Sequence, residues 1–496
     1  MVRFAHISRE VVTDLKGEGF GADSCVLLDE CSTQASWHVA HLERLFQHVT
    51  GKDEAPMGGC VFFPFGDWTQ LGPVKAGKKI PQAILDIYGD DDVRAWWMGN
   101  RAPAKKRAKG ELQREKRTDQ MCPYYKGAVL FTKVRWFELT QQQRCLDPVH
   151  TDFVESRFRG KPIDHLLVHS GYPDLTEDDM LLPEWVGACA LVSTNRQRYS
   201  LTHVRANHFA CYYGRVVFCW RKQVNAASWK GKPANPHHVL LAQEDPCFYE
   251  YFVMRAGGFF MCNYLRELKL VNALPFIYHS IKFDAETEKY IELVIRKVKL
   301  GDVITVEKPP LFINVELDMP ENTPEDVLTA RRGFSTERGK IIVPVKPLHS
   351  KWDNSPTPVR GGDGFQPSKV LLKQFFPIEP SFAITVHKSE GRTIDRVIIA
   401  LSGSQANRCD FSYEQVHVAF SRVKQGSHIR LLRTGRTAVD KLGSLLYLNK
   451  LNPDPAIFFY FAGFRDSYEE KLENPNMNWQ TNVWCPVRAN AKVRFC

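Results

Sequence analysis

The sequence predicts an α/β protein built on parallel β-sheets, with a mainly β region inserted into it. Short apolar runs that end in polar residues recur along the chain with helical patterns between them, which is typical of buried parallel strands. The runs are Cys25–Leu28, Val61–Phe65, Ala188–Val192 and Val397–Leu401. Ligands of such sheets bind at the carboxyl ends of the strands, so the polar residues after each run are candidates for a functional site.

A helix is expected behind the first strand. Apolar residues there follow roughly helical spacing, and Gly51 stands where a C-terminal cap would be. These apolar residues are Trp37, Val39, Leu42, Leu45, Phe46 and Val49. The acidic pair Asp29–Glu30 therefore lies directly between a predicted buried strand and a predicted helix.

The pattern changes at about residue 211, where short β-rich segments alternate with Pro and Gly residues. Residues 291–296 and 340–345 are examples. We expect a separate, mainly β insertion over residues 211–374. Within it, residues 354–367 are rich in Pro, Gly and Asp, and we expect them to form a linker or long loop that leads back into the α/β part.

Length and composition are those of a soluble protein with several domains. The 496 residues exceed one hydrophobic core and predict two to four domains, while 44% hydrophobic and 25% charged residues exclude wholesale disorder. The sequence has no run of about 18 apolar residues and no signal-peptide core, so we expect no membrane segment and an intracellular location. The 13 cysteines form no CxxC pair, and we expect reduced thiols and no structural metal.

The charge of the chain favours a polyanionic partner. Lys and Arg outnumber Asp and Glu by 66 to 56, which gives a net charge of +10. Between Arg101 and Arg117, eight basic residues stand against only Glu111 and Glu115. We interpret this segment as a solvated insertion loop. A DNA-tracking or nuclear-import patch is the alternative interpretation.

Polar residues after the first two strands suit phosphoryl transfer. An Asp at the end of a buried strand can hold Mg²⁺, and a Glu after it can orient or deprotonate the attacking water. Asp29 and Glu30 have these positions, although an Asp-Glu pair alone is equally typical of a surface turn. Gln70 follows the second strand and is placed to contact the same nucleotide and sense its γ-phosphate.

The ordered motifs resemble those of the Pif-type DNA helicases of superfamily one, which include the helicase parts of Helitron transposons. Residues 29–32 resemble motif II of that family, and Gly66–Val74 matches its Gly-Asp-x-x-Gln-Leu-x-Pro-Val motif at every fixed position. The resemblance implies two RecA-like domains, the second with an inserted Src-homology-3-like barrel. The expected divisions are a first domain at 1–150 with a basic insertion at about 76–130, a second domain at 151–210 and 375–440, the insertion and linker at 211–374, and a C-terminal extension at 441–496.

The resemblance also implies which residues contact the nucleotide. Residues 137–144 resemble motif IV, in which Arg144 would reach the γ-phosphate, and Arg422 becomes a second arginine finger after the capping-box pattern at 412–415. With Gln70 and Gly391 they would form the ATP-binding set, beside Asp29 as the metal ligand. The family usually has glutamine where this chain has Glu390, so this carboxylate either faces away from phosphate or alters the coupling.

The resemblance further implies that the nucleic-acid backbone meets small polar and basic side chains at two strand ends of the second domain, in segments 191–196 and 382–393 that resemble motifs of the family. These residues are Ser193, Thr194, Asn195, Thr385, His387, Lys388 and Ser389. A helix cap is the alternative interpretation of the first three.

The phosphate-binding loop of the family, GxxxxGK[ST], does not occur in the chain. Residues 16–21 lack its ending, and the segments at 77–79 and 231–233 lack its spacing and are expected to be solvated loops. We therefore expect the first RecA-like domain to be incomplete, with an exposed sheet edge. Pro64 either lies at a strand end or marks a decayed sequence.

The function implied by the resemblance is that of an ATP-dependent DNA helicase moving 5′ to 3′ on single-stranded DNA. Its cofactors would be ATP and Mg²⁺, and its partners single strands and DNA junctions, in repair, recombination or telomere maintenance, in the nucleus or the mitochondrion. The alternative hypothesis is a catalytically dead DNA-binding remnant, because losing the phosphate loop removes many transition-state contacts. A switch GTPase would need Asn-Lys-x-Asp, which is absent from the sequence.

Overall fold

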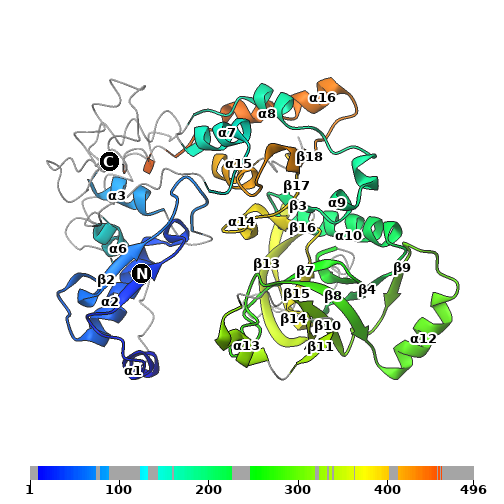
Figure 1. Cartoon of the computed structure of the whole chain (residues 1–496), viewed down its shortest axis with the longest axis horizontal. Coiled ribbons are helices and arrows are strands. Elements are labelled where there is room, and N and C mark those ends of the chain that lie inside the picture. Colours follow the sequence, from blue (N-terminus) through cyan, green and yellow to red (C-terminus); the bar gives the residue numbers. More distant parts are fainter. Residues whose placement is uncertain are drawn as a thin grey trace.

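The structure is a computed structural model and describes residues 9–73, 79–88, 123–131, 134, 143–158, 161–225, 246–318, 323–331, 334–337, 340–361, 364–401, 411–454, 456–457 and 460. The basic segment 101–117 and the predicted motif residues 137–140 lie outside this part of the chain. The described strands form five sheets. Figure 1 shows the first domain in blue, the second parallel sheet beside it, and the β-rich insertion in green and yellow.

The first domain is built on two parallel strands, β1 (Cys25–Leu28) and β2 (Val61–Pro64). The predicted helix is present as α2 (Ser36–Thr50), and Gly51 ends it with a left-handed φ of 71°. Helix α6 (Pro123–Phe131) crosses α2 so closely that a Cβ on Gly127 would lie 2.0 Å from the carbonyl oxygen of Ser36. Helices α1 (Arg9–Gly17) and α3 (Ile80–Tyr88) complete the described part of this domain.

Pro64 is the last residue of β2 and pairs with Leu28, the last residue of β1. It therefore lies at a strand end, where a missing backbone N–H costs little. The amide of the next residue, Phe65, still donates to the carbonyl of Leu28 at 2.8 Å. The proline does not interrupt the parallel pairing of the two strands.

The second domain contains a four-stranded parallel sheet in the order β16 (Ala383–Thr385), β3 (Cys189–Val192), β17 (Val397–Ile399) and β18 (Ile429–Leu431). All its strand residues are buried except Arg430, which is what a parallel sheet covered on both faces requires. Its long helices are α7 (Pro148–Phe158), α10 (Asn195–Tyr212) and α15 (Tyr413–Phe420). The predicted parallel α/β architecture is confirmed.

The expected domain boundary at residue 150 falls inside α7. This helix belongs with the second sheet, because Nε2 of His150 donates to the carbonyl of Phe420 at the end of α15 at 3.0 Å, and Nδ1 of His150 forms a hydrogen bond with the hydroxyl of Tyr172 at 2.8 Å. Short helices α8 (His165–Gly171), α9 (Pro183–Val186) and α14 (Val386–Ser389) connect the elements of this domain.

The insertion is mainly β, as predicted. Its largest sheet has six strands: β11 (Ser335–Glu337), β12 (Lys340–Val345), β10 (Phe312–Leu317), β8 (Pro275–Lys282), β7 (Gly257–Phe260) and β15 (Ile378–Pro380). A three-stranded sheet contains β6 (Tyr249–Val253), β4 (Val217–Arg221) and β9 (Val303–Val306), and another contains β13 (Leu348–Gly361), β14 (Gly364–Phe375) and β5 (Gln223–Asn225). A shared apolar core includes residues of the first two sheets, such as Trp220, Phe252 and Tyr278.

Two expectations about this insertion are wrong. Residues 291–295 are not a strand but the end of helix α12 (Ala285–Ile295). The helix begins at Asp284, whose carboxylate accepts from the amides of Glu286 and Thr287 at 3.0 and 2.9 Å. This N-cap, with acidic residues in the first turn, outweighs the β propensity of Ile291–Ile295.

The second wrong expectation is the linker at 354–367, which is part of the long antiparallel hairpin β13–β14. Pro358 lies opposite Pro367 in this hairpin. Among the described residues, the neighbouring strand β5 pairs with β14 from Leu371 to Gln374, so no described third strand lies beside either proline. Proline is tolerated at such edge positions, and its presence did not prevent strand formation.

The C-terminal region links the two domains, although the sequence offered no motif there. Leu445 and Leu448 are buried in the core of the second domain, whereas Ile457 and Tyr460 are buried in the core of the first. The ring of Tyr460 packs edge-on against Trp68 with centroids 5.9 Å apart. The chain after α16 (Ala438–Gly443) thus returns from one domain to the other. Among the described helices, none has the length and apolarity that crossing a membrane requires.

Candidate functional site

The carboxyl ends of β1 and β2 are locked together by a close backbone approach. The amide of Cys31 donates to the carbonyl of Phe65 at 2.7 Å. A Cβ on Gly66 would lie 2.8 Å from Sγ of Cys31 and 3.0 Å from two backbone nitrogens, so this position requires glycine. The acidic pair after β1 and the polar turn after β2 therefore form one continuous surface.

Glu30 has a left-handed backbone conformation, with φ 50° and ψ 45°. Asp29 supports it, because its Oδ1 accepts from the Glu30 amide at 2.9 Å, and Thr33 donates to the Glu30 carbonyl at 2.8 Å. A non-glycine residue in this region costs free energy and is found mainly at functional sites. Burial and the neighbouring charge of Asp29 raise the pKa of Glu30, against the opposing effect of Arg422.

Asp67 is the centre of a hydrogen-bond network that sequence reasoning missed. It accepts from the amide and hydroxyl of Thr69 at 2.8 and 2.5 Å, from Nε2 of Gln70 at 3.0 Å and from Nε2 of His417 at 3.3 Å. Burial alone would raise its pKa, but the hydrogen bonds, the bond from His417 first among them, lower the pKa of Asp67 to about 2. His417 lies on α15, so this carboxylate joins the two domains.

Lys79 also joins the domains, and the expectation of a solvated loop at this residue is wrong. It is only 6% exposed. Its Nζ donates to the carbonyls of Trp68 and Gln70 at 3.1 and 2.8 Å and forms an ion pair with Glu414 of α15 at 3.3 Å. A lysine in a short basic segment gives no sequence signal of such a position, which depends on α15 lying opposite.

Two arginines lie side by side on the second-domain face of the interface. Arg422 is 1% exposed, and its guanidinium donates to the carbonyls of Val418 and Ser389 at 2.9 and 3.2 Å. Burial and the nearby charge of Arg144 lower the pKa of Arg422 to about 10. Arg144 is partly exposed, and donates to the hydroxyl of Thr393 at 3.0 Å and to the carbonyl beside Arg422, that of Ser421, at 2.8 Å.

The carboxylate of Glu30 reaches across the interface to Gly391. A Cβ on Gly391, whose φ is 73°, would lie 3.5 Å from Oε1 of Glu30. The adjacent Glu390 accepts a hydrogen bond from the Leu71 amide of the first domain, while its Oε1 is buried with no partner among the described residues. Burial, and then the charge of Glu30, raises the pKa of Glu390 to about 7. Glu390 therefore faces the interface rather than solvent.

The predicted DNA-contacting residues come together because β3 and β16 are parallel neighbours, with Val192 paired to Thr385. Thr194 is the N-cap of α10, and its side-chain hydroxyl accepts from the Gln197 amide at 3.3 Å. For Thr194, the structure therefore agrees with the alternative interpretation as a helix cap. Ser389 is fully buried and donates to the Val386 carbonyl at 2.7 Å. Thr385 is 8% exposed. The hydroxyls of Ser389 and Thr385 are therefore inside the domain in this conformation.

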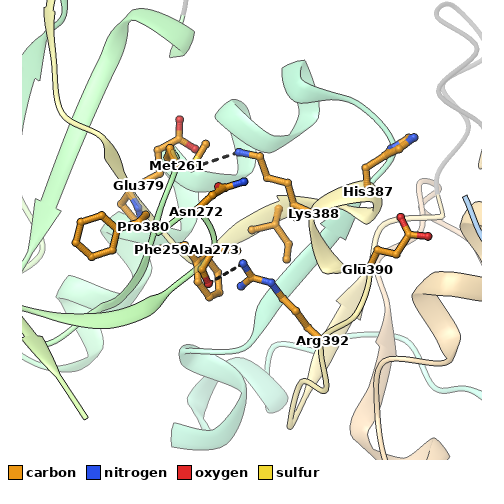
Figure 2. Close-up of a pocket in the computed structure, with 12 residues that line it drawn as sticks. Phe259, Met261, Asn272, Ala273, Glu379, Pro380, His387, Lys388, Glu390 and Arg392 are labelled. Carbon is orange, nitrogen blue, oxygen red and sulfur yellow. Dashed lines mark hydrogen bonds between the residues drawn. The ribbon is translucent and has the colours of Figure 1, made fainter. Parts of the chain in front are cut away.

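His387 and Lys388 border a cavity of about 260 Å³ between the insertion and the second domain. Figure 2 shows the side chains around it, with Phe259, Met261 and Asn272 from the insertion facing Lys388 and Arg392. The described residues thus contain two adjacent features, a charged interface between the domains and a cavity at the sheet edge.

Comparison with solved structures places this arrangement in a known fold. The chain aligns over 96% of its length with 80% of a helicase chain in a structure described as the basis of DNA unwinding at forked double-stranded DNA by two Pif1 helicases, with a TM-score of 0.51 and 14% identity. The chain has the fold of the Pif1 helicases. Bacteroides Pif1 bound to single-stranded DNA aligns with a TM-score of 0.49 and 14% identity, covering 92% of this chain and 78% of that one.

Pif1 helicase from Candida albicans also aligns, with a TM-score of 0.47 and 14% identity over 91% of this chain and 80% of that chain. No protein-family model and no curated protein matches the sequence. The likeness to Pif1 helicases is therefore one of fold, reached at an identity too low for residue roles to be transferred by alignment alone.

Several side chains at the interface suit the magnesium ion and terminal phosphate of ATP. Asp29 is exposed at the strand end, where Mg²⁺ needs a carboxylate oxygen. Arg144 offers a partly exposed guanidinium. Gln70 donates its Nε2 to Asp67 at 3.0 Å, and its buried Oε1, which has no partner in the described part of the chain, can accept from a water but not bind a phosphate oxygen. A loop for the inner phosphates would have to come from elsewhere than a GxxxxGK[ST] segment, since the sequence has none.

Proposed function

We propose that this chain is the motor of an ATP-dependent DNA helicase that moves 5′ to 3′ on single-stranded DNA. The observation that carries the proposal is the approach of Glu30 to Gly391 across the interface, where an added Cβ would lie 3.5 Å from Oε1 of Glu30, beside Arg144 and Arg422. In a motor of this kind, nucleotide bound between two domains closes them and its hydrolysis releases them. A carboxylate on one side and two guanidiniums on the other are the parts that such a cycle needs.

Each residue has a proposed task. Asp29 holds Mg²⁺, Glu30 orients the attacking water, and Gln70 contacts the γ-phosphate. Arg144 and Arg422 stabilise the charge that develops on the transferred phosphoryl group. Arg422 does so from a fixed position, because acceptors of its own domain hold its guanidinium.

The partners proposed for the motor are single-stranded DNA and DNA junctions. The strand would pass over the edge where Ser193, Asn195, His387 and Lys388 lie, since basic and small polar groups bind phosphate oxygens without reading sequence. The process served is proposed as repair, recombination or telomere maintenance, in the nucleus or the mitochondrion.

DNA-stimulated ATP hydrolysis by the full chain tests the motor. We expect turnover that single-stranded DNA increases and that Glu30→Gln abolishes. The matched control is Glu54→Gln, which changes an exposed glutamate of the same domain and should leave turnover unchanged. Absence of turnover in the unaltered chain would refute the motor proposal.

A second candidate function is a DNA-binding protein without turnover. It is favoured by the absence of a GxxxxGK[ST] segment from the sequence and by the complete engagement of Arg422 with its own domain. Such a protein would bind single strands with a strong dependence on salt, because phosphate contacts release counterions. Salt-sensitive binding with no hydrolysis would support this function over the motor.

A further inference from the structure

The cavity of about 260 Å³ lies where the insertion meets the second parallel sheet. One wall is the end of β7 and the turn before β8, with Phe259, Met261 and Asn272. The other wall is α14 and the residues after it, with Lys388 and Arg392. Figure 2 shows these side chains pointing toward one another across the hollow.

A cation–π pair of Arg392 and Phe259 forms part of the lining of the cavity. The guanidinium of Arg392 lies 4.1 Å from the ring centroid of Phe259 and donates to the carbonyl of Ala273 at 2.9 Å. Both contacts hold the guanidinium in a defined plane. Guanidinium and aromatic planes are the surfaces on which single-stranded nucleic-acid-binding proteins stack bases.

The charges around the cavity are mixed. Lys388 and Arg392 are balanced by Glu379 and Glu390, and Glu379 in turn forms an ion pair with Arg198 of α10. A phosphate group inside the cavity would be attracted by the cations and repelled by the carboxylates, so its net gain would be small. A neutral, flat group with hydrogen-bonding edges fits this lining better. The exposed side-chain amide of Asn272 offers both a donor and an acceptor to such an edge.

The mouth of the cavity lies on the proposed path of the DNA. His387 is exposed, and Lys388 follows it at the carboxyl edge of the sheet. A phosphate bound at this edge would leave its base within reach of the hollow. In a single strand, a base is displaced from its neighbours at a cost of a few kcal/mol or less, because no base pair has to be broken.

We propose that this cavity takes one base of the bound single strand, stacked on the Phe259–Arg392 pair, with the neighbouring phosphate held at the edge of the cavity by His387. The proposal rests on the proposed binding of single-stranded DNA. It assigns the insertion a direct part in gripping the strand, since Phe259 and Asn272 belong to the insertion and Arg392 to the second domain.

An abasic-site scan with the full chain tests the cavity. The ligand is a fluorescent single strand joined to a duplex, so that the junction sets the register, and each unpaired nucleotide is made abasic in turn. Stacking of a base contributes about 1–3 kcal/mol, which corresponds to roughly 5- to 150-fold in affinity. We expect a loss in this range at one position and much smaller effects at the others.

Phe259→Leu keeps an apolar side chain and removes the aromatic ring. In this variant, the loss of affinity at the one sensitive position should fall to the level of the other positions. Phe218→Leu is the control, because Phe218 packs against Phe252 and Phe283 elsewhere in the insertion and should leave the scan unchanged. Equal thermal unfolding of the two variants excludes loss of fold as the cause. A uniform scan, or one that Phe259→Leu does not alter, overturns the base pocket while leaving DNA binding intact. Absence of any binding overturns both this proposal and the proposed function.

Discussion

Asp67 is expected to stabilise the contact between the domains mainly through its charge. A pKa of about 2 in place of the ordinary 3.8 corresponds to roughly 2 kcal/mol of stability at neutral pH. Because the folded pKa is depressed, this stability is present above about pH 4 and is lost as the pH falls through 2. Asp67→Asn removes the charge and sets an amide against the donors Gln70 and His417. We expect it to lower the free energy of unfolding at pH 7 by about 2 kcal/mol.

Urea unfolding followed by tryptophan fluorescence measures this effect, because Trp68 lies beside Asp67 in the first-domain core. The decisive quantity is the difference in unfolding free energy between the parent protein and Asp67→Asn as the pH is lowered from 7 to 3. That difference should shrink over the acidic part of the range. Asp53→Asn, at an exposed position of the same domain, serves as the control and should show little effect. A difference that stays constant with pH would show that the charge of Asp67 contributes no stability.

Three further changes test other parts of the interface. Lys79→Met should lower the unfolding free energy by about 1–3 kcal/mol, because the carbonyls of Trp68 and Gln70 and the carboxylate of Glu414 lose their donor. The control Lys52→Met, at an exposed site, should have little effect in the same urea titration. Burial raises the pKa of Glu390 to about 7 in the folded protein, so the ionised carboxylate destabilises the fold at high pH. Glu390→Gln should therefore raise the unfolding free energy by on the order of 2 kcal/mol above pH 7 and leave it unchanged below pH 4.5. A gain in stability that does not vary with pH would contradict this. Gly66→Ala should lower the melting temperature and cost about 1–3 kcal/mol of unfolding free energy, because the added Cβ collides with Cys31. Gly21→Ala should not, because a Cβ there meets nothing within 4 Å. Equal melting temperatures of the two variants would refute the close approach of Gly66 to Cys31.

Much of the α/β framework follows from local pattern. The apolar runs at 25–28 and 189–192 are both strands of parallel sheets, as predicted, but only 189–192 is buried, whereas Cys25 and Leu27 of the first run are exposed. Ser412 and Gln415 cap α15 reciprocally, as their spacing predicts. The two errors in the insertion arose where local signals conflict, since β-rich residues at 291–295 follow a strong helix N-cap and proline-rich residues at 354–367 lie along the edge of a hairpin.

The candidate site is less accessible to sequence reasoning. Order along the chain indicated Asp29, Glu30, Gln70 and Arg422, because each follows a strand or a cap with a recognisable pattern. Asp67 and His417 were missed, although Asp67 stands inside the same motif as Gln70. Their importance lies in a contact between residues 350 positions apart in the sequence, which no local pattern encodes.

The sequence by itself determined four of the described parallel strands and the polar residues that follow them, because periodicity and capping are local properties, whereas the short strands β16 and β18 were not predicted. The tertiary structure alone decided that Lys79 is a buried bridge, that Glu390 faces the carboxylate of Glu30, and that Arg422 is held by main-chain carbonyls. It also decided that Ala456, Ile457 and Tyr460 pack in the core of the first domain. The physical reason is that burial and electrostatic environment depend on which surfaces meet, and those surfaces come from distant parts of the chain.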